Sequence, residues 1–169
     1  TGAYAAASAA VISVGRQGLA LDAPVELFSA REVTYRTGSP VDGAVPCGVD
    51  ASGDGPVDIV GRSLHALTAE TATGNGTSID NAASSANGGV AHIHCTVVSG
   101  SSPTNTVKVQ HSTDNAVWPD LVTFTALTAA GKERSEVAAG TTVNRYLRST
   151  RAIGGTTPSF TYAVAFARR

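Results

Sequence analysis

The sequence is poor in charge, in aromatic side chains and in cysteine, and each shortage excludes a class of protein. Charged residues make up 15% of the 169 residues, against about 25% in an average domain, so much of the surface is expected to be covered by neighbours. Aromatic residues make up 5%, too few for a platform that stacks nucleic-acid bases. Two cysteines, Cys47 and Cys95, cannot form a disulfide scaffold, although one bridge or two buried thiols remain open.

Long apolar runs and catalytic motifs are also missing. No stretch approaches the roughly 18 uninterrupted apolar residues of a membrane-spanning helix, so we expect no membrane insertion. The small apolar residues at the start lack the basic flank of a signal peptide. No nucleophile elbow, phosphate loop or zinc-helix motif occurs. We therefore predict a protein that is not an enzyme and has no cofactor.

Charge is divided unevenly along the chain. Residues 1–89 carry four Arg and nine acidic residues, about −5, while residues 90–169 carry eight Lys and Arg and four acidic residues, about +4, which gives the net charge of −1. Oppositely charged halves can attract head to tail between copies, or neutralise one another within one folded chain.

The first third of the chain predicts strands rather than helices. Residues 2–14 allow a short helix, but their β-branched end favours a strand. Residues 25–36 place Val25, Leu27, Val33 and Tyr35 on one face, interrupted by Ser29 and Arg31, as in a long, partly exposed strand. Shorter strands are predicted near 43–49 and 57–60. Residues 70–89 contain one large apolar residue, Ile79, and should form a polar linker or a loop that covers a sheet edge.

The remaining residues are typical of an antiparallel β-sandwich. Five β-rich runs, at 90–98, 106–111, 121–127, 143–148 and 160–166, are divided by Gly, Ser, Pro and Asn clusters, which is the spacing of a sandwich. Phe160, Tyr162, Val164 and Phe166 alternate with small residues, so the last run should be central to the core. Trp118 follows a turn sequence and should cap that core.

Histidines and arginines give the chemical candidates. His92 and His94 lie two apart on one strand face, and His111 could approach from a neighbouring strand to complete a zinc or nickel site. Without a matching carboxylate, a set of surface histidines is the favoured interpretation, and no metal is predicted. Arg145, Arg148 and Arg151 do not form one continuous stripe for phosphate, so salt bridges across a subunit seam, or plain surface charge, explain them better than recognition of nucleic acid.

Seven segments, taken in order, resemble the second half of the tail tube proteins of long-tailed actinobacterial bacteriophages. They are Ser39-Pro-Val-Asp-Gly43, Gly61-Arg-Ser-Leu-His-Ala-Leu67, Thr71-Ala-Thr-Gly-Asn-Gly-Thr-Ser-Ile-Asp-Asn81, Gly88-Gly-Val-Ala-His-Ile-His94, Val107-Lys-Val-Gln-His-Ser-Thr-Asp114, Asn144-Arg-Tyr-Leu-Arg148 and Tyr162-Ala-Val-Ala-Phe-Ala-Arg-Arg169. The resemblance covers nearly all of the chain from about residue 15. It depends on order and spacing, because no segment is a chemical motif.

The resemblance implies a C-terminal portion of such a protein, in agreement with the Thr at position 1. Residues 1–67 would be the last part of a β-sandwich or barrel domain in the tube wall, and residues 68–169 an outer β-sandwich domain. Copies would form stacked hexameric rings in the virion, assembled in the host cytoplasm with other tail proteins, and DNA would pass through the tube during ejection.

Charged residues on the strand at 25–36 and in the basic group are the candidates for a seam between copies or for the lumen: Glu26, Arg31, Glu32, Arg36, Arg145 and Arg148. An acidic lumen would repel the phosphate backbone and let DNA slide. Two alternatives stay open. One is a carbohydrate-binding module, in which Trp118, Tyr146 and Tyr162 stack on sugars such as host-surface glycans. The other is a capsid decoration or head–tail joining protein.

Overall fold

The computed structural model describes residues 10–16, 18–37, 47–53 and 58–169. It describes the side chains of these residues except those within residues 31–59. The described residues form an all-β, antiparallel fold without helices, which confirms the predicted fold class. The strands are β1 (Ala10–Val14), β2 (Pro24–Thr37), β3 (Cys47–Gly53), β4 (Asp58–Glu70), β5 (Gly74–Asn75), β6 (Ile79–Asp80), β7 (Gly89–Ser112), β8 (Asp120–Thr123), β9 (Gly131–Val137) and β10 (Tyr146–Arg168).

The chain divides into two compact units. One comprises residues 1–12 and 28–57, and the other comprises residues 13–27 and 58–169. In the first unit, β2 and β3 form an antiparallel hairpin in which Ala30 lies opposite Gly53 and Thr37 opposite Cys47. Strand β4 runs across positions 67 and 68, where the sequence predicts a domain boundary. The division into a tube domain and an outer domain stays a prediction.

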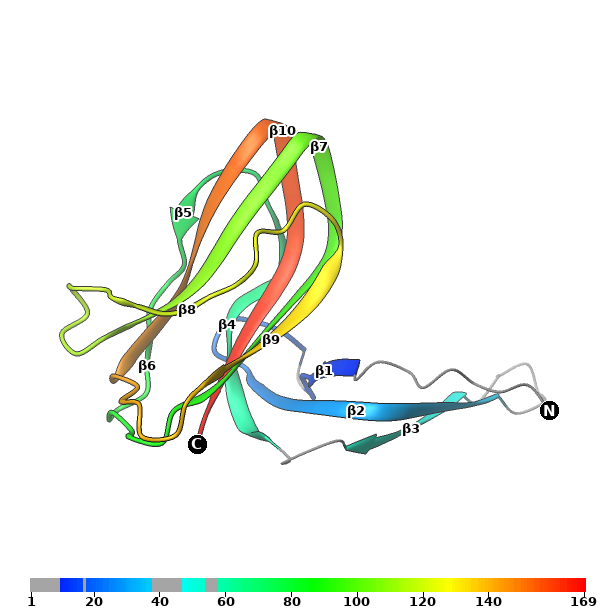
Figure 1. Cartoon of the computed structure of the whole chain (residues 1–169), viewed down its shortest axis with the longest axis horizontal. Helices are drawn as coiled ribbons and strands as arrows, with labels where there is room; N and C mark the ends of the chain where they lie inside the picture. The colour runs from blue at the N-terminus through cyan, green and yellow to red at the C-terminus, as the bar shows by residue number, and fades with distance from the viewer. Residues whose placement is uncertain (1–9, 17, 38–46, 54–57) are drawn as a thin grey trace. The chain divides into compact units, whose positions relative to one another are not determined.

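Two long strands bend sharply in the second unit, so that one sheet folds over on itself (Figure 1). Residues 89–99 of β7 pair with residues 159–168 of β10, and residues 104–112 of β7 pair with residues 146–154 of β10. The bend contains Gly100 and Gly155, whose φ angles are 115° and 110°. A Cβ atom on Gly100 would lie 2.8 Å from the Thr157 carbonyl oxygen. Both φ values lie in a region that side chains disfavour, so glycine permits the bend.

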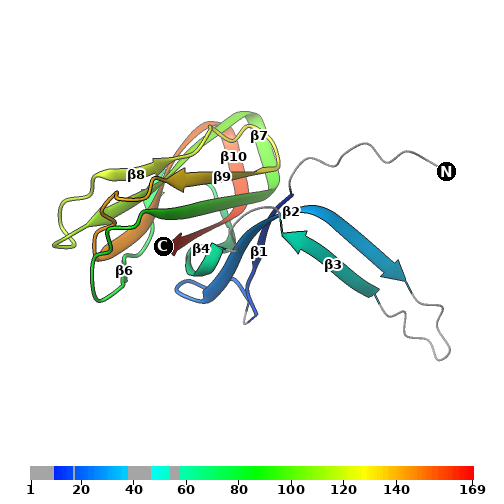
Figure 2. The ribbon, with the colours of Figure 1, turned by 60° about the horizontal axis from the view of Figure 1, so that its bottom comes forward.

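The two halves of the folded sheet are called here the β9 arm and the β8 arm (Figure 2). In the β9 arm, β4 and β9 flank the paired halves of β10 and β7. In the β8 arm, β5 and β6 lie along β10, and β8 lies along β7. Residues 70–89, which were predicted to be a linker or an edge-covering loop, thus contribute two short strands to the sheet.

One hydrophobic core lies between the two arms. Phe160, Tyr162, Val164 and Phe166 project into it from β10, each at most 2% exposed. This confirms that the last β-rich run is central to the core. Val107, Val109 and Leu147 contribute from the β8 arm. The predicted runs 90–98 and 106–111 are therefore parts of one bent strand, β7, and the run 160–166 and most of 143–148 are parts of another, β10, because the two halves of each share one core.

A second, smaller core covers the outer face of the β9 arm. Val25 and Leu27, both fully buried, pack there against Val90, Ala165 and Ala167, with Leu19 beside them. Backbone hydrogen bonds from Ser63 N to Ala23 O and from Asp22 N to Ser63 O attach this segment to β4. Residues 24–27 belong to β2 and pair with residues 58–62 of β4, so the sheet itself continues into the segment that covers this face.

Candidate functional site

The candidate seam residues on β2 are only partly described. Glu26 is half-buried, and its carboxylate lies 2.8 Å from the Arg16 guanidinium. Arg31, Glu32 and Arg36 lie on the half of β2 that pairs with β3, and their side chains lie outside the described residues. Their assignment to a seam or to the lumen stays a prediction.

Arg145 is bonded within its own chain. Its Nε and Nη2 atoms donate to the two carboxylate oxygens of Asp80 at 2.7 and 2.6 Å. These charged hydrogen bonds, together with one from the Ala82 backbone, lower the pKa of Asp80 to about 2. The Arg145 guanidinium also lies 5.0 Å from the centre of the Tyr146 ring. Arg145 thus donates its hydrogen bonds to Asp80 of the same chain, and these bonds hold β6 to the start of β10.

Arg148 is likewise used within the β8 arm. Its Nε and Nη2 atoms donate to the side-chain oxygen of Gln110 at 2.9 and 2.8 Å, and its guanidinium lies 4.2 Å from the centre of the Trp118 ring. Gln110 in turn donates to Asp120, which also accepts from Lys108. This ladder crosses β10, β7 and β8 on the outer face of the β8 arm.

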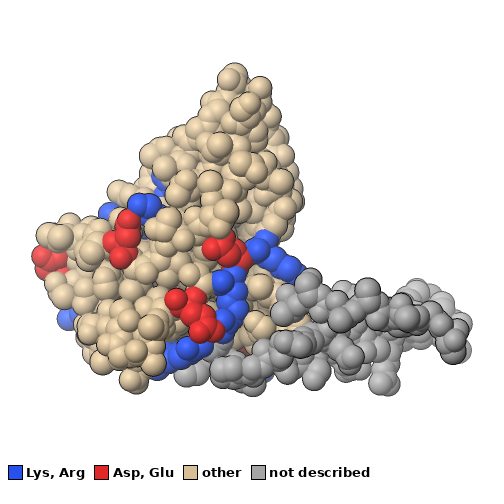
Figure 3. Space-filling model, in the orientation of Figure 1, with Lys and Arg blue, Asp and Glu red and all other residues tan. Residues whose placement is uncertain are grey.

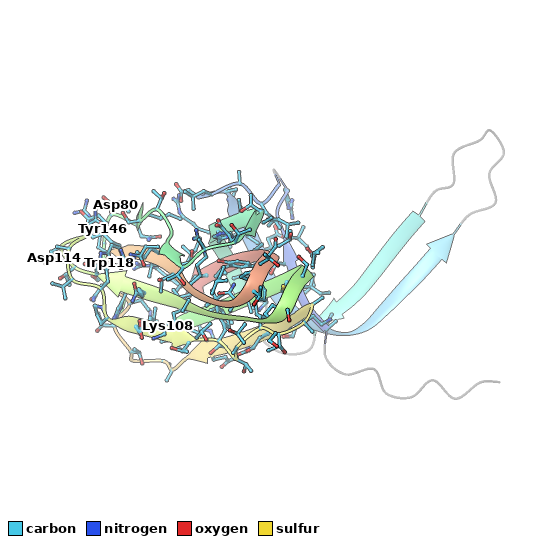
Figure 4. All side chains as sticks on the ribbon, turned by 90° about the horizontal axis from the view of Figure 1, so that it is seen from above. Asp80, Lys108, Asp114, Trp118 and Tyr146 are labelled. Carbon is cyan, nitrogen blue, oxygen red and sulfur yellow. The ribbon has the colours of Figure 1, made fainter. Side chains whose placement is uncertain are left out.

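The end of the β8 arm carries the aromatic residues that were considered for sugar binding (Figure 4). Trp118 and Tyr146 are half-buried there. Asp114 shapes the adjacent turn, because its carboxylate accepts from Ser112 and from the Ala116 and Val117 backbone, which lowers the pKa of Asp114 to about 2. The third aromatic, Tyr162, is fully buried in the core, so it cannot join an exposed aromatic platform.

The three histidines do not form a metal site. His92 and His94 lie in the β9 arm, where their Nδ1 and Nε2 atoms are 3.1 and 3.0 Å from the Ser13 hydroxyl. His111 lies in the β8 arm and accepts a hydrogen bond from Asn144 N. Within the described part of the chain, no group of three or more His, Cys, Asp or Glu side chains could hold a metal ion.

His92 and His94 are also not surface histidines, which was the favoured interpretation. His92 is fully buried and His94 half-buried, because residues 13–27 cover the outer face of their strand. Burial and the nearby charge of Lys132 lower the pKa of His94. Nothing in the alternation of residues 90–98 indicates that a distant segment covers both faces.

Two exposed strand edges of the second unit differ in charge. Strand β9, whose only strand partner in the described chain is β7, carries Lys132, Glu133, Arg134 and Glu136. At the other edge, residues 66–69 of β4 are Ala, Leu, Thr and Ala. Thr68 and Ala69 pair with β10, Ala66 and Leu67 fall in a register shift of that pairing, and no other described strand pairs with these four residues. Leu67 is 45% exposed. Charge on an edge strand opposes pairing with another chain, so of these two edges the β4 edge is the one more open to a partner strand.

The bend of the folded sheet has no charge on the face shown in Figure 3. The sequence agrees, since residues 96–107 and 152–164 contain no Lys, Arg, Asp or Glu. Val97, in this region, is 55% exposed. The segments without charged residues therefore lie at the bend and at the neighbouring β4 edge.

The described residues contain a free, buried thiol and no helix that could cross a membrane. The thiol belongs to Cys95, and burial raises its pKa. Cys95 therefore does not form the disulfide bridge that the sequence left open.

Sequence reasoning missed the partners that residues far apart in the chain provide. Ser13 meets histidines about eighty positions away, and Glu70 pairs with Arg151 at 2.6 Å. The charged strand β9 was also missed, because alternation of apolar residues was the signal for a strand and residues 131–137 have little. No protein-family model matches the chain, and no curated protein matches it.

Proposed function

We propose that this chain is a structural subunit that assembles with copies of itself through open strand edges. The observation that carries the proposal is the pairing pattern of the sheet. Residues 66–69 of β4 have a strand on one side only within the described chain, and they carry no charge. Among the described strands, β3 pairs only with β2.

Open strand edges favour strand addition, since each presents unpaired N–H and C=O groups. Residues 66–69 of β4 carry no charge, and β3 contains one acidic residue, Asp50. Two different edges on one chain suit head-to-tail contacts, in which one surface of a subunit meets another surface of the next. Such contacts generate rings or filaments. The hairpin of β2 and β3 supports the same proposal, because a two-stranded hairpin is marginally stable in water and gains from a third strand.

The resemblance of the sequence to phage tail tube proteins supplies the form of the assembly. We propose stacked hexameric rings in the tail of a virion, with DNA passing through the central channel and other tail proteins at the ends of the tube. Low charge favours this function, because a subunit in a tube is largely covered by neighbours. In this proposal the intramolecular bonds of Arg145 and Arg148 stabilise the outer domain rather than the seam.

Negative-stain microscopy and mass determination of the chain in low-salt buffer test the proposal. We expect rings or hollow tubes for the unmodified chain. The double variant Leu67→Lys, Ala69→Lys should shift the mass toward the monomer, because pairing would have to desolvate two charges. Val117→Lys is the matched control, since Val117 is 70% exposed in a loop outside both edges, and it should assemble normally.

A chain that stays monomeric at high concentration contradicts the self-assembly proposal. Closed particles of a different symmetry would instead favour the capsid decoration alternative. Rings or tubes that form equally well from the double variant would retain self-assembly and exclude the β4 edge as its contact.

A second candidate function is the binding of sugars at the end of the β8 arm. It is favoured by the half-buried Trp118 next to Val117, which has the largest exposed fraction among the large apolar side chains of the described residues. Indole rings stack on sugar rings. Binding to a glycan array that is lost in Trp118→Ala and kept in Tyr162→Phe would support this candidate, and an array without any bound glycan would exclude it.

A further inference from the structure

Strand β4 contains extra residues where it pairs with β10. Thr68 lies opposite Tyr162, and Ser63 lies opposite Ala165. Between these two pairs the chain takes five steps along β4, from 63 to 68, but three steps along β10, from 162 to 165. The register of the pairing shifts at two places in this stretch, one of them within the edge residues 66–69. Such extra residues form β-bulges, which bend a strand and interrupt its regular pairing.

A bulge makes a strand edge less suited to a partner strand. In a regular strand the N–H and C=O groups on the open side follow a repeating pattern that a second strand can match. An extra residue breaks this pattern, and sheets use bulges on edge strands to oppose pairing with other chains. The edge at residues 66–69 of β4 is therefore uncharged but irregular.

The side chains of His65 and Glu70 meet across the bulge that contains Ala66 and Leu67. In a regular strand, residues five positions apart lie about 16 Å apart and point to opposite faces. In β4 their side chains are in contact, with His65 Nε2 3.1 Å from Glu70 Oε1. A straight β4 would break this contact, so the contact favours the bulged form.

Both ends of the bulged segment are attached to β10. The His65 ring stacks on the ring of Tyr162 with 4.3 Å between centres, and its Nδ1 donates to the Tyr162 carbonyl oxygen at 3.2 Å. The other carboxylate oxygen of Glu70 accepts from Arg151 Nη2 at 2.6 Å. The side chains of His65, Arg151 and Glu70 are 6%, 15% and 24% exposed, so salt screens their contacts less than those of a surface pair. These three side chains are called here the β4 clamp.

We propose that the β4 clamp is an autoinhibitory contact, which holds the edge at residues 66–69 in a bulged form and limits the addition of a strand from a second copy of this chain. The inference rests on the proposed function, because it concerns the regulation of the same edge. A copy can join its neighbour through this edge only while the clamp is open. The apparent affinity between copies is therefore reduced by the fraction of chains in the open form.

Hydrogen exchange of the monomeric chain tests whether the clamp holds the edge. Arg151→Gln removes the charged partner of Glu70 without changing any residue of β4. We expect the amides of residues 66–69 to exchange about tenfold faster in this variant than in the unmodified chain, both at a concentration at which the chain is monomeric. His65→Gln acts at the other end of the bulge and should have the same effect. Retained protection of residues 159–168 would show that each variant is folded.

Arg62→Gln is the matched control for this measurement. It removes the same charge from β4 outside the segment between His65 and Glu70, at a guanidinium that bonds to Asp22 at 2.5 Å. Exchange at residues 66–69 should be the same in this variant as in the unmodified chain. If exchange there is also unchanged in both clamp variants, the clamp does not hold the edge and the inference is wrong.

The concentration at which the chain assembles, measured by light scattering, tests the effect on assembly. We expect Arg151→Gln and His65→Gln to assemble at about tenfold lower concentration than the unmodified chain and Arg62→Gln, because more chains have an open edge. Addition of Leu67→Lys and Ala69→Lys to Arg151→Gln should abolish this gain. A gain that persists with the two lysines would place the contact elsewhere and overturn the inference.

The same measurement separates this inference from the proposed function. If the unmodified chain assembles and both clamp variants assemble at the same or a higher concentration, the clamp does not restrain the edge, while self-assembly itself stands. If the unmodified chain and all the variants stay monomeric, self-assembly is wrong, and the regulation of its edge is wrong with it.

Discussion

The β9 arm has a core on each of its two faces, and the two cores are built from alternate residues of the same strands. Phe160 and Phe166 of β10 project into the inner core, while Ala165 and Ala167 project into the outer one. The inner core receives large side chains because a second arm faces it. The outer core has small side chains on β10, where among the described residues the segment 13–27 covers it. The size of the side chains on each face of β10 thus matches the thickness of the layer that covers that face.

Loss of a large inner side chain should have the largest effect. We expect Phe160→Ala to lower the free energy of unfolding by about 3–5 kcal/mol, because Phe160 is fully buried between the two arms and its removal leaves a cavity. Denaturant unfolding would measure the loss. Val97→Ala, at a side chain that is 55% exposed on β7, is the control and should change stability by less than about 0.5 kcal/mol.

A substitution in the outer core should lower the free energy of unfolding less, and it should affect a smaller part of the chain. We expect Leu27→Ala to cost roughly 2–3 kcal/mol, at the low end for buried leucine, because a single covering segment can collapse into the space. Hydrogen exchange should show lost protection for residues 13–27 while residues 159–168 stay protected. A uniform loss over both regions would show that the two cores unfold as one unit.

Acid should destabilise the folded chain through His94 and His111. Burial, and the charge of Lys132, lower the pKa of His94 below its ordinary value, and burial, with Arg168, lowers that of His111. A histidine whose pKa is lower in the folded chain stabilises it above the unfolded value of about 6.5, and this stability is lost as the pH falls below that value. Thermal unfolding between pH 8 and pH 5 should therefore show a falling midpoint.

The variant His94→Gln separates the two histidines. It should reduce this pH dependence and leave the part that comes from His111. Ser13→Ala removes the hydroxyl that contacts both His92 and His94 without removing an ionisable group, so it should lower stability while preserving the pH dependence. If His94→Gln retains the full pH dependence, His94 is not its source.

The sequence predicts the inner core better than the outer one, for a physical reason. Alternation within one strand, as at Phe160 and Tyr162, identifies a buried face without knowledge of its partner. The outer core depends on contacts between Leu27 and residues more than sixty positions later, and nothing local to either segment indicates them. His92 was misjudged for the same reason, since periodicity identifies the second face of a strand but not what covers it.

Candidate site residues show the same limit. Arg145 and Arg148 are recognisable as a basic group in the sequence, but their partners Asp80 and Gln110 come from other strands. The uncharged β4 edge was present in the sequence as Ala66, Leu67 and Ala69. Its openness follows from the topology, because only the order of strands shows which side of β4 has no partner within the described residues.

The smallest effect on stability is expected on the outer face of the β8 arm, where the ring of Trp118 packs against the strands. Trp118 lies over Arg148 there, and a partly exposed cation–π pair contributes about 0.5–1 kcal/mol. We expect Arg148→Gln to lower the free energy of unfolding by at least that amount, because it also removes the hydrogen bonds to Gln110. Trp118→Ala combined with Arg148→Gln should then cost less than the sum of the two single changes. Additive costs would mean that Trp118 stabilises the arm by packing alone.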